Sequence, residues 1–92
     1  MPVTNSEILR KIWIEETPNS KKRRLVPLLS KALGITDQAV SLRLTGKIGT
    51  NDAEFLFMMA VIKRHGINTE MFESNLAQIR SQYGIFEEYE LQ

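Results

Sequence analysis

"LLSKALGITDQAVSLRLTGK" (residues 28–47) is the stretch that decides the fold, because its apolar pattern stops at Gly34 and starts again at Thr36. Apolar residues recur at helical spacing before the glycine, and Gly34 suits the left-handed position that ends many helices. Thr36 is a favourable N-cap for a second helix. The pattern therefore predicts two short helices, about 25–33 and 36–45, joined by a sharp turn.

The second of these helices has two different faces. With about 100° between successive residues, Val40 and Leu44 fall on one side, where they can pack against the protein. The opposite arc is mostly polar and has no evident core to meet. We call this arc the outer face; it consists of Gln38, Ser41, Leu42 and Thr45.

Outside residues 28–47 the sequence predicts three more helices and no strand. Thr4 and Glu7 form a capping box before a first helix that Pro18 ends, and we expect "TPNSKKRR" to be a polar connector. In the helix after this connector, Pro27 fits the first turn. Asn51 caps an apolar central helix that ends at His65-Gly66, and Asn68 or Thr69 caps the last. The predicted fold class is all-α, a compact domain of five helices.

Length and composition set limits on this chain. Its 92 residues suit one domain, which we place at residues 1–84, followed by a short tail at 85–92. The absence of cysteine excludes disulfides and thiolate metal sites. No apolar run is long enough to cross a membrane, and the first residues lack a signal-peptide pattern, so we expect a cytoplasmic protein.

Charge is divided unevenly along the chain. Residues 1–64 hold eleven Lys and Arg against six Asp and Glu, whereas residues 65–92 hold one basic residue, Arg80, against five acidic ones. The basic part suits a polyanion, and chance clustering on solvated faces explains the numbers equally well.

The stretch 28–47 resembles the helix-turn-helix of Cro/C1-type (XRE-like) regulators of phages and bacteria. The matching positions are Leu29, Gly34, Ile35, Val40, Ser41, Leu44, Gly46 and Lys47. Ser30 departs from the usual alanine, and Leu42 and Arg43 depart from the usual residue types. The resemblance covers about residues 25–62, with the helix-turn-helix at about 25–45. It implies a lambda-repressor-like fold and a small DNA-binding transcriptional regulator, a phage or mobile-element repressor, whose helix 36–45 enters the major groove.

The resemblance also implies roles for single residues. Gln38 is expected to bind a base edge, Ser41 a base or phosphate, and Leu42 a thymine methyl group. Asp37 either accepts from a cytosine amine or only stabilises the helix N-terminus. The remaining candidate DNA contacts are Thr36, Arg43, Thr45 and Lys47, together with the basic run Lys21, Lys22, Arg23 and Arg24.

Nothing in the sequence predicts catalysis, a metal site or a cofactor. His65 is the only histidine, there is no cysteine, and "TGKIGTND" does not have the spacing of a phosphate-binding loop. A histidine at a helix C-terminus is sufficiently explained by the helix dipole.

The C-terminal apolar residues predict either packing onto the first helix or a subunit interface. We expect a homodimer that reads a two-fold symmetric operator in double-stranded DNA. The residues proposed for this interface are Leu76, Ile79, Tyr83, Phe86 and Tyr89. Asp37 and Leu42 motivate an alternative, a protein-interaction module (adaptor, anti-repressor or antitoxin) that keeps the fold with little or no DNA binding.

Overall fold

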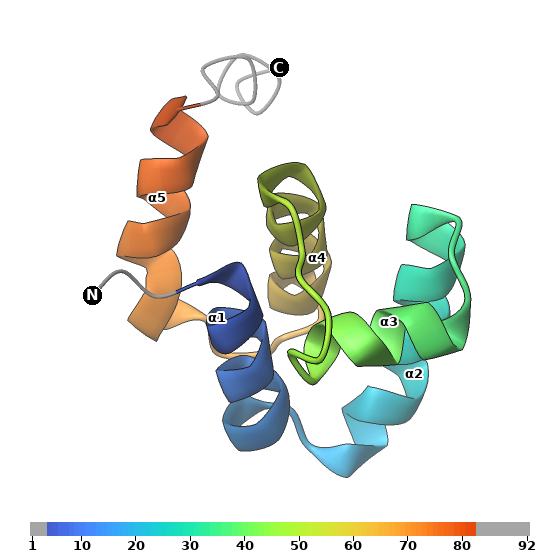
Figure 1. The fold of residues 1–92 in the computed structure, drawn as a ribbon. Helices are drawn as coiled ribbons and strands as arrows, with labels where there is room; N and C mark the ends of the chain where they lie inside the picture. The colour runs from blue at the N-terminus through green and yellow to red at the C-terminus, as the bar shows by residue number, and fades with distance from the viewer. Residues whose placement is uncertain (1–3, 83–92) are drawn as a thin grey trace.

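In the computed structural model, which describes residues 4–82, the chain forms five α-helices and no strand (Figure 1). The helices are α1 (Asn5–Lys11), α2 (Asn19–Leu33), α3 (Asp37–Leu44), α4 (Asp52–Arg64) and α5 (Glu73–Gln82). A π-helical turn (Ile12–Glu16) continues α1, and a 3-10 turn (Glu70–Phe72) precedes α5. The predicted all-α class and its five helices are confirmed. The expectations for Tyr83, Phe86, Tyr89 and the tail lie outside the described residues.

Three helices begin at the predicted caps. Oγ1 of Thr4 accepts a hydrogen bond from the backbone N–H of Glu7 at 3.2 Å, and Oγ1 of Thr36 accepts one from Ala39 at 3.1 Å. Oδ1 of Asn51 accepts from the N–H of Glu54 at 2.8 Å. Each cap satisfies a backbone donor that has no partner within its own helix, which fixes where the helix starts.

The predicted polar connector is wrong, because α2 begins at Asn19 and includes the whole basic run. The carbonyl of Pro18 accepts from the N–H groups of Lys21 and Lys22 at 3.0 and 3.1 Å, which closes the first turn. Four cations near a helix N-terminus are unfavourable for the helix dipole. Lysine and arginine are nevertheless good helix formers, and tertiary contacts of this turn add to that preference.

The predicted place of Pro27 is wrong for the same reason, because the proline lies inside α2 instead of in its first turn. A proline there cannot donate to the carbonyl of Arg23, and its ring crowds that carbonyl. Despite the missing hydrogen bond at Pro27, α2 is continuous from Asn19 to Leu33.

The core lies between α4 and the other helices, as its apolar sequence predicts. α4 contributes five buried side chains, and α1, α2 and α3 each contribute two. In Figure 1, α5 and the α2–α3 pair lie on opposite sides of α1 and α4. The buried apolar residues are Ile8, Leu9, Ile12, Leu25, Leu29, Val40, Leu44, Phe55, Leu56, Met58, Met59, Ile62, Ile67, Phe72 and Leu76.

The last helix differs from the prediction in two respects. Asn68 and Thr69, the predicted caps, precede a 3-10 turn and not α5 itself; Thr69 is the cap position of that turn, and Oδ1 of Asn68 accepts from the N–H of Glu70 at 3.0 Å. Leu76, proposed for a dimer interface, is 1 % exposed and belongs to the core of this chain. A buried side chain offers no surface to a second subunit, so within the described residues only the half-buried Ile79 stays available for that role.

Candidate nucleic-acid interface

The turn between α2 and α3 is held by hydrogen bonds from both sides. Gly34 has φ +70°, the left-handed conformation predicted for it, and its N–H donates to the carbonyl of Ser30 at 2.9 Å. The N–H of Ile35 reaches the same carbonyl at 3.1 Å. The Ser30 hydroxyl donates to the carbonyl of Ile35. Ser30, which stands where Cro/C1-type sequences usually have alanine, therefore connects the turn to α2.

The two sides of α3 differ as predicted at Gln38 and Ser41, but less than predicted at Leu42 and Thr45. Val40 and Leu44 are 0 % exposed, whereas Gln38 and Ser41 on the outer face are exposed. Leu42 and Thr45 are half-buried, and Oγ1 of Thr45 donates to the carbonyl of Ser41 at 2.8 Å. With eight residues, α3 is about 12 Å long. An α-helix with its side chains is about 10–12 Å across, which fits the width of a DNA major groove, about 12 Å.

The N-terminal end of α3 is open to solvent. Thr36 caps the helix through its hydroxyl oxygen, which leaves the hydroxyl proton free to donate outward. Asp37 is exposed in the first turn, where a carboxylate is favourable for the helix dipole. The capping role of Thr36 is confirmed, and contacts of either residue with DNA stay predictions.

Arg43 points away from the outer face and joins α3 to α4. Its Nε lies 3.2 Å from Oε2 of Glu54, and its Nη1 donates to the carbonyl of Ala39 at 3.1 Å. The side chains of Arg43 and Glu54 are 17 % and 26 % exposed. Asn51 donates from Nδ2 to the other carboxylate oxygen of Glu54 at 2.8 Å. We infer that Arg43 positions α3, and we leave it out of the DNA contacts that we propose.

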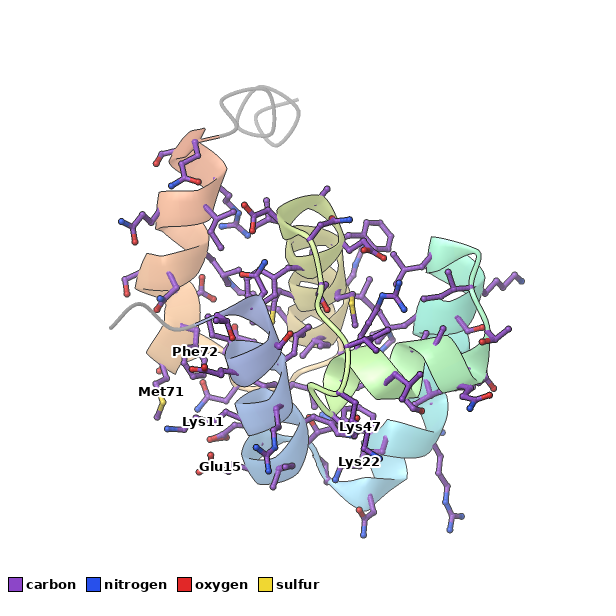
Figure 2. The ribbon with its side chains drawn as sticks, viewed as in Figure 1. Lys11, Glu15, Lys22, Lys47, Met71 and Phe72 are labelled. Carbon is purple, nitrogen blue, oxygen red and sulfur yellow. The ribbon has the colours of Figure 1, made fainter. Side chains whose placement is uncertain are left out.

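The segment after α3 is fixed to the N-terminal part of the chain. Gly46 has φ +76°, and the N–H of Lys47 donates to the carbonyl of Leu42 at 2.9 Å. Nδ2 of Asn5 donates to the carbonyl of Thr50 at 3.1 Å and to Oδ1 of Asp52 at 2.8 Å. The side chain of Lys47 is exposed just after the C-terminal end of α3 (Figure 2), and its contact with a phosphate stays a prediction.

The basic run of α2 is split between two environments. Nζ of Lys21 donates to the carbonyl of His65 at 3.0 Å, and Nζ of Lys22 lies 5.4 Å from the centre of the Trp13 ring. Arg23 and Arg24 are exposed. The structure therefore does not present the four cations as one patch: two serve internal contacts, and two face solvent.

Sequence patterns missed two features of this site. The ion pair of Arg43 with Glu54 joins residues on different helices, so no helical spacing indicates it. Arg10 on α1 lies against Gly46, where a Cβ added to the glycine would be 3.6 Å from the Arg10 Cβ. The contact of Arg10 with the end of α3 depends on the tertiary fold, so no spacing within the first helix indicates it.

Other kinds of site find little support in residues 4–82. This part of the chain has no group of three or more His, Asp or Glu residues placed to hold a metal ion. None of its helices is long and apolar enough to cross a membrane.

Comparison with known proteins identifies no relative of this chain. The chain matches no protein-family model, no curated protein and no solved structure.

Proposed function

We propose that this protein is a sequence-specific DNA-binding transcriptional regulator that places α3 in the major groove of double-stranded DNA. The observation that carries the proposal is the asymmetry of α3. Val40 and Leu44 anchor the helix in the core, while Gln38 and Ser41 are exposed on its opposite side, where a helix in the major groove faces the bases.

The proposed contacts divide into base readers and phosphate contacts. Gln38 reads a base edge, with adenine as its best bidentate partner, and Ser41 and Leu42 complete the contact with the groove. Thr36 and Lys47 lie at the two ends of α3, where the phosphate strands border the groove. Arg23 and Arg24 add exposed positive charge on α2.

The biological setting follows from the resemblance to Cro/C1-type regulators. We propose a lambda-repressor-like fold, a small phage or mobile-element repressor that acts by occupying a promoter, and a cytoplasmic location. A homodimer would place two copies of α3 on half-sites about one DNA turn apart.

Selection of bound duplexes from a random pool, followed by affinity measurements at two salt concentrations, tests this proposal. We expect a defined consensus, two-fold symmetric if the protein binds as a dimer, and an affinity that falls steeply with salt. Gln38→Ala should relax the base preference at one position of each half-site. A failure to enrich any duplex, or binding that does not depend on salt, would refute the DNA-binding function.

A protein-interaction module is the second candidate, and exposed apolar side chains favour it. Ile14 after α1 and Met71 before α5 are 58 % and 66 % exposed. Variants Gln38→Ala and Lys47→Ala separate the two functions. A partner protein that binds both variants as well as the unaltered chain, together with no detectable DNA binding, would support the second candidate.

A further inference from the structure

Arg10 lies where α1 meets the C-terminal end of α3. A Cβ built on Gly46 would lie 3.4 Å from the backbone oxygen of Ser6 and 3.6 Å from both Cβ and Cδ of Arg10. The aliphatic stem of Arg10 therefore runs along the first residue after the α3 cap. α1 packs on α3 in the same region.

The guanidinium of Arg10 is available to a ligand. Arg10 is exposed, and within residues 4–82 its side chain has no ion-pair or hydrogen-bond partner. Glu7, one helical turn earlier, shares a shallow surface of α1 with it but forms no ion pair with it. Arginine is well suited to phosphate because its planar fork can donate two parallel hydrogen bonds.

The geometry of a duplex brings phosphates to this place. An α-helix with its side chains is about 10–12 Å across and fills a groove about 12 Å wide, so a phosphate strand runs along each side of it and groups on the elements that flank α3 can reach these strands. Lys47 follows Gly46 directly and is exposed at the C-terminal end. Arg10 reaches the same end from a different helix.

We propose that Arg10 binds a phosphate of the DNA backbone together with Lys47, so that the phosphate-contact surface extends from α3 onto α1. This inference rests on the proposed function and adds a residue to it. The contact fixes the register of α3 in the groove and carries no base preference of its own.

The neighbouring Lys11 provides a matched control. It has the same charge and is also exposed in the last turn of α1. Lys11 borders the shallow surface shared by Glu7 and Arg10 and also a small hollow with Met71 and Phe72, and Figure 2 shows it on the side of α1 turned away from Lys47. Neutralising either residue changes the net charge by one, so only their positions distinguish them.

The test measures the affinity for a selected duplex against salt concentration for the full chain and for Arg10→Gln, Lys11→Gln and Lys47→Gln. We expect Arg10→Gln and Lys47→Gln each to reduce the log–log slope by about 0.9, and Lys11→Gln to leave it nearly unchanged. Arg10→Gln should weaken binding to the selected duplex and to a random duplex by the same factor. Arg10→Lys should restore the slope, which a purely packing role of arginine would not predict.

Two outcomes overturn the inference. If Arg10→Gln and Lys11→Gln have the same slope, whether reduced or unchanged, Arg10 makes no phosphate contact of its own. If Arg10→Gln loses affinity with an unchanged slope, the residue acts through the structure of α1. Both leave the DNA-binding function intact, whereas a complete absence of duplex binding by the unaltered chain refutes that function itself. Circular dichroism of each variant shows whether it is folded.

Discussion

Replacing Arg43 by methionine should weaken the protein without removing a DNA contact. The substitution keeps a long side chain between α3 and α4 but removes the ion pair with Glu54 and the hydrogen bond to the carbonyl of Ala39. Because the outer face lies elsewhere on α3, we expect stability and DNA binding to respond differently.

The expected loss of stability is about 1 kcal/mol. A partly exposed ion pair with one charge-assisted hydrogen bond contributes about that much after allowance for solvent screening. The larger penalty of about 3–5 kcal/mol for breaking a fully buried pair does not apply, because the Glu54 side chain is 26 % exposed and keeps its hydrogen bond from Asn51. The carbonyl of Ala39 also keeps the helical N–H of Arg43 as a donor.

Thermal unfolding followed by circular dichroism measures this loss. For a domain of this size, about 1 kcal/mol corresponds to a fall in Tm of about 4–8 °C. In a double-mutant cycle, Arg43→Met should cost less in a Glu54→Gln background. The salt slope of DNA binding should stay unchanged in Arg43→Met, whereas the control Lys47→Met should reduce the slope by about 0.9 and leave Tm nearly unchanged.

The opposite pattern would refute this reasoning. An Arg43→Met variant with the Tm of the unaltered protein and a slope reduced by about 0.9 would show that the guanidinium binds phosphate instead of Glu54. An Arg43→Met substitution that lowers Tm equally with and without the Glu54→Gln change would show that the two side chains are not coupled.

Three further predictions concern the turn, the loop after α3 and the contact of α4 with α5. Gly34→Ala should lose about 1 kcal/mol of unfolding free energy and Gly34→Asn less, because the φ of Gly34 is +70° and an added Cβ meets nothing within 4 Å. Thermal unfolding of both variants measures the difference, and equal stability of the two variants and the unaltered protein would contradict it. Thr50→Val should leave the unfolding free energy unchanged or raise it by up to about 1 kcal/mol, because the buried Thr50 hydroxyl has no hydrogen-bond partner in the described part of the chain. Urea unfolding measures this, and a clear loss of stability would show that the hydroxyl does have a partner. The hydrogen bond from Lys63 lowers the pKa of Glu73 below its ordinary value of 4.5. The ionised Glu73 therefore stabilises the folded protein above pH 4.5, and this stabilisation is lost as the pH falls through the pKa that Glu73 has in the folded state. Glu73→Gln should flatten the fall in Tm as the pH decreases below 4.5, and an unchanged fall would contradict that role.

Local sequence signals predicted much of the fold. The caps Thr4, Thr36 and Asn51 and the left-handed Gly34 each depend on residues within a few positions of one another, so a short stretch of sequence contains the whole interaction. The division of α3 into a buried and an exposed side follows from helical periodicity alone.

Contacts between distant residues could not be predicted in this way. α2 begins earlier than expected, and its first turns are supported by Lys21 at the carbonyl of His65 and by Lys22 at the Trp13 ring. Helix spacing also does not reveal that Glu54 lies beside Arg43, whose contact with DNA, implied by the resemblance, stays a prediction. Both cases concern charged residues, whose partners are set by tertiary structure and not by the local pattern.

Backbone amide shifts of the 15N-labelled protein, recorded during titration with a selected duplex, test the central claim most directly. The account predicts the largest changes at Gln38 and Ser41 and smaller ones at Lys47 and Arg10. The amides of α5 should change little, because α5 lies on the other side of the molecule from α3 (Figure 1). Changes concentrated around Ile14 and Met71, or no saturable change with any duplex, would contradict the claim that α3 binds DNA.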